Sequence, residues 1–327
     1  MIEIRRFGSN PLITPASVPS SLLKWYPRSW RGIFNCGVIF DTAIDRFRML
    51  FRIGVRMFSS LGYAESWDGV NWNISEKPAL KFWDNHFWNF RTICGIEDPR
   101  IVKWVNGCFY IFATAGTLLY NLAGGAKWSK FGIWKTRDFE NFEWVGAPIK
   151  GERKNAAVFS EPFGPYAYLI FRQNRCICLA RSKDLTLQSG WSDCQILLSP
   201  GQVYQDAVKR QNRIGLAGPP VKLENGWLIV FHVKQGKGLS GANFRYTLGF
   251  MVVDKKDPSK ILYLHPAPVL RPEKLEELYG HVRNVVFSCA TVDLGPRSNR
   301  INIYWGAGDT SICGGYLEKD KIMALIK

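Results

Sequence analysis

The stretch NGWLIVFH at residues 225–232 begins with turn residues and continues as a run of large apolar side chains that ends on a histidine. The same form recurs as RFRMLFR at 46–52, NGCFYIFA at 106–113, GPYAYLIFR at 164–172 and NRINIYWG at 299–306. Turn residues followed by a short apolar and aromatic run are typical of a β-strand. The last residues of the five runs are roughly sixty positions apart, with a longer final step, so the chain carries an internal repeat.

A second pattern recurs between these strands, in which Ser or Thr, any residue and Asp precede an aromatic residue. It occurs at Ser66-Trp67-Asp68, Thr136-Arg137-Asp138 and Ser182-Lys183-Asp184, and Asp257-Pro258 is interpreted as a degenerate copy. Ser and Asp favour turns because their side chains bond to nearby backbone groups. About sixty residues accommodate four strands of about 5–6 residues with their loops. Five such units predict an all-β, five-bladed β-propeller, with a pair of β-sandwiches as the alternative.

The repeat spans most of the 327 residues, which we therefore interpret as one catalytic domain over 1–327. Residues 1–30 match no unit and are interpreted as an N-terminal extension. The C-terminal strand is expected to close the ring. The clearest helical stretch is Pro272 to Leu278, of one or two turns.

The formal net charge of +16 favours an anionic partner, either nucleic acid or a phosphate-bearing substrate, unless it is only a solvated basic surface. Lys and Arg are scattered rather than gathered in runs, which argues against nucleic acid. The eight cysteines form no paired metal-ligand spacing, so we expect buried free thiols, no metal site and a reducing, cytoplasmic location. No long apolar segment predicts a membrane span, and a homo-oligomer is left open.

Three repeat-equivalent strands end on polar residues: Arg52, Arg172 and His232. In a propeller, the ends of equivalent strands converge on one pocket. Buried cations are costly unless an anion meets them, so core filling is a poor explanation for these side chains. The pattern indicates a pocket that binds an anion.

Two aspartates are candidate site residues. Asp98 lies between apolar residues in GIEDPRI at 95–101 and is either a general acid or the structural partner of Arg100 in an ion pair. Asp309 follows the last repeat strand in YWGAGDT at 304–310 and either receives hydrogen bonds from sugar hydroxyl groups or forms a turn with Thr310.

Taken together, several segments resemble glycoside hydrolase family 130, the β-mannoside phosphorylases and their hydrolytic relatives. They occur in the order of the family, from about Asn35 to the C-terminus, as Phe34-Asn35, Phe51-Arg52, GIEDPRI at 95–101, Lys154 to Arg172, RIGLAGPPVKLENGWLIVFH at 213–232, YTLGFMVVDKKDPSK at 246–260, NVVFSCA at 284–290 and YWGAGDT at 304–310. The fold of that family is a five-bladed propeller, in agreement with the repeat.

The resemblance implies a role for each matched residue. Asp98 would be the sole catalytic acid. Phosphate would be bound by Lys154, Arg172, Arg213, His232 and Tyr246, and the sugar by Asn35, Arg52, Arg100, Phe287 and Asp309. Phosphate would attack the anomeric carbon with inversion, so a second carboxylate would not be needed as base, unlike in ordinary inverting glycosidases.

The implied activity is reversible phosphorolysis of β-mannosides to α-mannose 1-phosphate, with inorganic phosphate as co-substrate and no cofactor. Glu97 beside Asp98 departs from many relatives, and we take it to favour β-1,2-linked manno-oligosaccharides. Lys154 stands where an Arg often occurs. Two alternatives remain: a β-mannoside hydrolase of the same family, and a non-catalytic propeller that binds sugars or nucleic acid. Retention of the basic side chains favours the phosphorylase.

Overall fold

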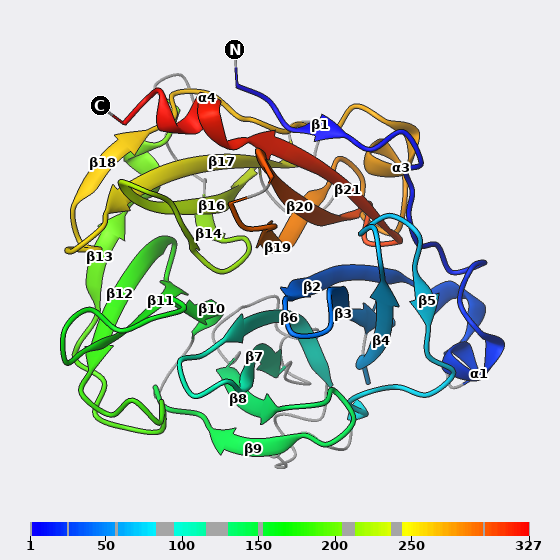
Figure 1. The fold of residues 1–327 in the computed structure, drawn as a ribbon. Helices are drawn as coiled ribbons and strands as arrows, with labels where there is room; N and C mark the ends of the chain where they lie inside the picture. The colour runs from blue at the N-terminus through cyan, green and yellow to red at the C-terminus, as the bar shows by residue number, and fades with distance from the viewer. Residues whose placement is uncertain are drawn as a thin grey trace.

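The computed structural model describes residues 2–24, 26–55, 58–82, 95–115, 130–149, 153–204, 213–236, 244–296 and 298–326. Its strands form five antiparallel sheets set around a common centre (Figure 1). The predicted all-β, five-bladed propeller is confirmed, with each blade built from consecutive strands.

Within each blade, successive strands lie progressively further from the centre. Blade 1 contains β2 (Ile33–Asp41), β3 (Arg46–Ile53), β4 (Ser60–Ser66) and β5 (Asn73–Ile74). Blade 2 contains β6 (Ile96–Lys103), β7 (Phe109–Ala115), β8 (Lys130–Thr136) and β9 (Glu143–Gly146). Blade 3 contains β10 (Lys154–Val158), β11 (Ala167–Gln173), β12 (Cys176–Ser182) and β13 (Gln195–Leu198). Blade 4 contains β14 (Arg213–Leu216), β16 (Gly226–Gln235), β17 (Arg245–Asp254) and β18 (Ile261–Leu264), with β15 (Val221–Lys222) beside β16. Blade 5 contains β19 (Val286–Asp293), β20 (Arg300–Ala307), β21 (Ser311–Glu318) and β1 (Arg5–Arg6).

The repeated strands of the sequence are β3, β7, β11, β16 and β20, which are the second strands of their blades. They are therefore not the strands that line the central channel. The first strands lie innermost, since β2 contacts β6 and β19, and β10 contacts β6 and β14. The strand register also corrects one repeat position. Arg52 pairs with Phe34 of the inner strand in blade 1, and Thr114 pairs with Glu97 of the inner strand in blade 2. Thr114, not Ala113, is therefore the equivalent of Arg52.

The predicted Ser/Thr-x-Asp turns are confirmed in blades 1 to 3. In blade 1, Ser66 Oγ accepts the backbone N–H of Gly69, and Asp68 Oδ1 accepts that of Val70. In blade 4 the interpretation of Asp257 as the equivalent residue needs correction. Asp254, at the end of β17, accepts the backbone N–H groups of residues 256 and 257. The carboxylate of Asp257 accepts the N–H and the hydroxyl of Ser259.

The hydrophobic core lies between neighbouring blades. Leu50 of blade 1 belongs to a buried cluster with Ile111 and Trp134 of blade 2, and further clusters join the remaining blades around the ring. The aromatic residues that follow the Ser/Thr-x-Asp turns, among them Trp72 and Trp144, pack against these clusters. Large aromatic rings suit this place because each buries a large apolar area between two sheets.

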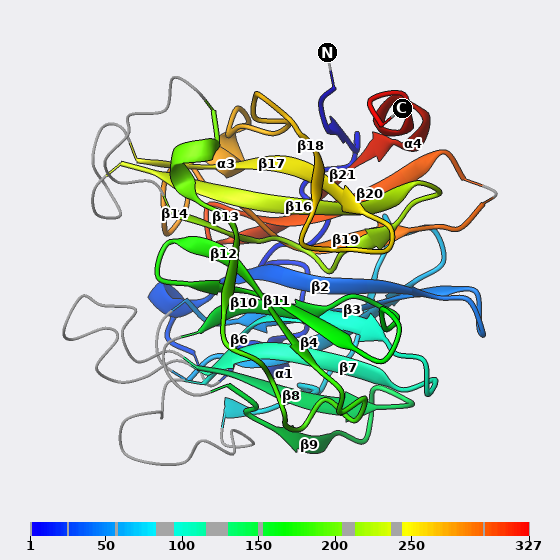
Figure 2. The same cartoon turned by 90° about the vertical axis from the view of Figure 1, so that its left-hand side faces the viewer.

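The two ends of the described chain lie at the same edge of the molecule, where the N-terminal β1 pairs with the C-terminal β21 (Figure 1). The predicted helix before blade 5 is present as α3 (Leu275–Leu278), which lies at one side of the ring (Figure 2). The described residues also contain the short helices α1 (Ser20–Leu23) and α4 (Lys319–Met323), which the sequence patterns do not predict. No helix among the described residues is long and apolar enough to cross a membrane.

Candidate active site

Three inner strands carry a β-bulge at the same place. The register shifts after Phe34 in β2, after Glu97 in β6 and after Lys154 in β10. The residue at each shift, Asn35, Asp98 or Asn155, has a positive φ of 48°, 53° and 53° respectively. Asn and Asp tolerate this left-handed conformation better than other non-glycine residues. Because bulges re-aim side chains, the three blades present equivalent polar groups toward one point.

That point is a cavity of about 210 Å³ at the ends of the inner strands. Nine of the predicted site residues line it: Asn35, Arg52, Asp98, Lys154, Arg172, Arg213, Tyr246, Phe287 and Asp309. The structure therefore brings residues of all five blades together in one pocket.

Asp98 is held by a hydrogen bond and an ion pair. Asn35 Nδ2 donates to Asp98 Oδ1 at 2.8 Å, and Arg52 Nη1 lies 3.5 Å from the same oxygen. Burial by itself raises the pKa of the Asp98 carboxyl, but the charges of Arg52 and Lys154 and the Asn35 hydrogen bond outweigh it, so the pKa is lowered. Asp98 is consequently ionised in the unliganded pocket.

Arg100 is buried and is not among the residues that line the pocket. Its guanidinium donates to three backbone carbonyl oxygens, those of Ala217 at 2.6 Å, Leu216 at 2.8 Å and Asp98 at 3.0 Å. Among the described contacts, the proposed side-chain ion pair with Asp98 is replaced by this bond to the Asp98 carbonyl. Arg100 joins the bulge of β6 to blade 4 and thereby fixes the backbone that carries Asp98.

The cationic side of the pocket comes from blades 3 and 4. Lys154 and Arg172 pair directly across β10 and β11, and both are buried. On blade 4, Arg213 Nη2 donates to the hydroxyl of Tyr246 at 2.7 Å. Guanidinium groups with their fixed donors suit phosphate or carboxylate oxygens, and the ammonium of Lys154 adds a compact point charge.

His232 is fully buried behind the pocket wall and does not line the cavity. Its ring lies 4.3 Å from that of Phe287 and 5.8 Å from that of Tyr246, measured between centroids. Burial, followed by the charges of Arg100, Arg172 and Arg213, lowers the pKa of His232 well below its usual value, so the imidazole is neutral. Neither ring nitrogen has a hydrogen-bond partner among the described residues.

Asp309 lies between β20 and β21 with a φ of 52°. Burial raises its pKa to about 7, and the negative charges of Asp98 and Glu97 add to the effect while Arg52 opposes it. The turn with Thr310 is also present, since Thr310 donates its N–H to Ala307 O. The turn and the pocket position therefore coexist.

Sequence reasoning missed several residues of the pocket wall. Asn155 lies at the third bulge, and its Oδ1 is buried without a hydrogen-bond partner in the part of the chain that the structure describes. Its place directly after Lys154 parallels that of Asp98 after Glu97, so a comparison of the inner strands could have found it. The apolar wall contains Phe244, Val282 and Val285, for which the sequence carries no comparable signal.

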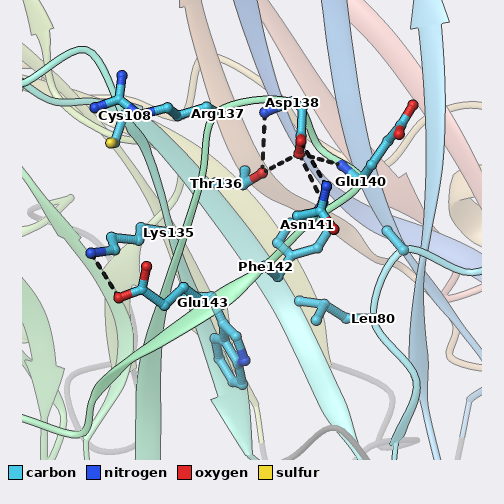
Figure 3. Close-up of a pocket in the computed structure, with 12 residues that line it drawn as sticks. Leu80, Cys108, Lys135, Thr136, Arg137, Asp138, Glu140, Asn141, Phe142 and Glu143 are labelled. Carbon is cyan, nitrogen blue, oxygen red and sulfur yellow. Dashed lines mark hydrogen bonds and ion pairs between the residues drawn. The ribbon is translucent and has the colours of Figure 1, made fainter.

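A larger cavity, of about 810 Å³, lies on the outer part of blade 2 (Figure 3). Three of its charged groups, Lys135, Asp138 and Glu143, have partners within the blade. Asp138 accepts hydrogen bonds from Thr136, Glu140 and Asn141, and Lys135 pairs with Glu143 at 2.8 Å. Nothing in this cavity resembles the convergence of acids and bases at the centre. Across the described residues, His, Cys, Asp and Glu form no group of three that could hold a metal ion.

Comparison with known proteins identifies relatives over the whole propeller. The family described as beta-1,4-mannooligosaccharide phosphorylase, glycoside hydrolase family 130, matches residues 3–327. A β-1,2-mannobiose phosphorylase of Thermoanaerobacter is 31% identical, covering 98% of this chain and 99% of the relative, and a 1,2-β-oligomannan phosphorylase of the same bacterium is 28% identical, with the same coverage. The solved structure of a Listeria innocua β-1,2-mannobiose phosphorylase bound to β-1,2-mannobiose is 25% identical, with a TM-score of 0.77 and coverage of 99% of both chains.

Proposed function

We propose that this chain, which belongs to glycoside hydrolase family 130, catalyses the reversible phosphorolysis of β-mannosides, with β-1,2-linked manno-oligosaccharides as substrates. The relatives that carry this activity in their names align with nearly the full length of the chain. The products would be α-mannose 1-phosphate and a shortened sugar.

The observation that supports this proposal best is the cluster of cations in the pocket. Lys154, Arg172 and Arg213 of blades 3 and 4 line the same cavity as Asp98. A phosphate ion bound to these cations is already a negatively charged nucleophile, so no carboxylate base is required to activate it. In hydrolysis by inversion, by contrast, a second carboxylate must activate water.

In the proposed reaction, a phosphate oxygen attacks the anomeric carbon as the glycosidic C–O bond breaks, and Asp98 supplies the proton that the departing sugar oxygen takes up. By the family resemblance, this proton passes through a mannose hydroxyl. Asp98 must therefore be protonated when substrate is bound. The negative charge of phosphate beside Lys154 would offset the cations that lower the pKa of Asp98, and so would favour its acid form.

The test is to incubate the protein with β-1,2-mannobiose in the presence and absence of inorganic phosphate. We expect mannose 1-phosphate to form only with phosphate, and Asp98→Asn to lower the rate by about 10²–10⁴-fold without loss of the fold. Equal release of mannose without phosphate would show a hydrolase instead. An unaffected rate in Asp98→Asn would remove Asp98 from the mechanism.

A further inference from the structure

Glu97 lies in β6 immediately before Asp98 and is buried in the pocket wall. Its two carboxylate oxygens face two different cations. Oε1 lies 2.9 Å from Arg52 Nη2, and Oε2 lies 3.9 Å from Lys154 Nζ. Since Arg52 belongs to blade 1 and Lys154 to blade 3, a single side chain of blade 2 links the cations on its two sides.

Arg52 is in turn shared between two neighbouring carboxylates. One guanidinium nitrogen, Nη2, faces Glu97, and the other, Nη1, lies 3.5 Å from Asp98 Oδ1. Its Nε donates to Gly54 O at 3.2 Å, and its Cζ lies 4.9 Å from the centre of the Phe34 ring. The fork of donors in a guanidinium has a fixed geometry, so the contact with Glu97 limits how fully Arg52 can pair with Asp98.

We propose that Glu97 is a positioning residue that holds Arg52 and Lys154 in place in the unliganded pocket and yields Lys154 to the incoming phosphate. This inference rests on the proposed function, because it takes phosphate as the anion. A carboxylate beside Lys154 opposes the arrival of a second anion. Glu97 therefore weakens phosphate binding. It also keeps Arg52 from forming a full ion pair with Asp98.

The first test is Glu97→Gln, which removes the charge and keeps the length of the side chain. By titration calorimetry with inorganic phosphate alone, we expect the Kd to fall by about 3- to 10-fold, the size expected from the loss of one neighbouring charge. In phosphorolysis, the KM for phosphate should fall and kcat should fall with it, because Arg52 can then pair fully with Asp98. Unchanged or weaker phosphate binding would overturn the proposal.

Two control variants separate this role from other effects. Glu161→Gln makes the same change in net charge at an exposed residue, 2.6 Å from Lys222 Nζ and outside the pocket, and should leave the phosphate Kd unchanged. Glu97→Asp keeps the charge and should bind phosphate about as weakly as the unaltered protein. If Glu97→Asp binds as tightly as Glu97→Gln, charge is not the cause and the proposal fails.

Pairing with Lys154 is tested by a double-mutant cycle. In a Lys154→Gln background, Glu97→Gln should tighten phosphate binding less than it does in the unaltered protein, because only the direct repulsion between Glu97 and phosphate remains. An equal effect in both backgrounds would overturn the assigned contact. The calorimetry involves no sugar, so the two proposals can fail separately. If no mannoside is phosphorolysed but Glu97→Gln still tightens phosphate binding, only the proposed function fails. If phosphorolysis occurs and the Kd does not change, only the role of Glu97 fails.

Discussion

At Asp309, burial raises the pKa of the carboxyl group to about 7, so the environment favours the protonated form. At Asp98, in the same pocket, the positive charges of Arg52 and Lys154 and the Asn35 hydrogen bond outweigh burial and lower the pKa. Two carboxyl groups in one site therefore differ in protonation because one is surrounded by donors and cations. Pairs of this kind mark groups with separate roles in many active sites. Folding therefore moves the titration of Asp309 to near neutral pH.

This difference predicts how stability varies with pH. Because the pKa of Asp309 is raised on folding, the folded protein holds a proton that the unfolded chain releases, and its contribution to stability falls as pH rises from about 4 to about 7. Asp309→Asn should remove that slope and should have a higher Tm than the unaltered protein at about pH 8. Thermal unfolding of both proteins across this pH range is the measurement. If the Tm of the two proteins varied with pH in the same way, the raised pKa of Asp309 would be contradicted.

At the scale of the strand, the bulges of β2, β6 and β10 decide where Asn35, Asp98 and Asn155 point. A regular strand would alternate its side chains between the two faces of the blade, and the extra residue changes that alternation. The cost is a left-handed conformation at three non-glycine residues. The contact of Arg100 with Ala217 and Leu216 holds the bulge of β6 against blade 4.

The strain at Asn155 can be measured with two substitutions that both remove its side chain. At an ordinary strand position alanine is more stable than glycine, but at a φ of 53° alanine is strained and glycine is not. We expect Asn155→Ala to be less stable than Asn155→Gly by about 1 kcal/mol in urea unfolding. The neighbouring Ala156→Gly is the control and should be destabilising. The opposite order at position 155 would show that the left-handed conformation is not maintained.

For the whole molecule, the ring is joined through the N-terminal residues, since β1 supplies the outer strand of blade 5. From this strand, Arg6 reaches Glu277 of α3, with Nη2 2.8 Å from Oε2 and Nε 2.9 Å from Oε1. Glu277 is fully buried and also accepts the backbone N–H groups of Glu273 and Lys274. Because α3 leads into the segment that contains Val282 and Val285, this ion pair connects closure of the ring to the pocket wall.

Removing Arg6 should therefore destabilise the whole fold. Arg6→Met leaves the buried Glu277 carboxylate without its cation, and breaking a buried pair in this way costs about 3 kcal/mol. Arg5 is the matched control, because its contact with Glu318 is exposed and Arg5→Met should change stability little. Urea unfolding of the two variants gives the comparison. Similar stability for both would show that Glu277 finds other partners.

The sequence by itself determined the number of blades, the turns between their outer strands and most of the residues that line the pocket. These features repeat or follow local chemistry. Arg52 and Arg172 lie two repeats of roughly sixty residues apart, His232 lies one repeat further on, and Asp68 forms its turn with nearby backbone groups. The family resemblance supplied the roles expected of Lys154, Arg213 and Tyr246, which the repeat alone did not.

Only the tertiary structure decided which strand lies innermost, where Arg100 and His232 lie relative to the pocket, and that Glu97 links two cations. Arg100 bonds to carbonyl groups more than a hundred residues away, and Glu97 contacts side chains of two other blades. Local sequence cannot specify such contacts, because they depend on how one sheet is rotated and shifted against the next. The ionisation of Asp98 and Asp309 depends on the same arrangement, since burial and neighbouring charges exist only once the ring is assembled.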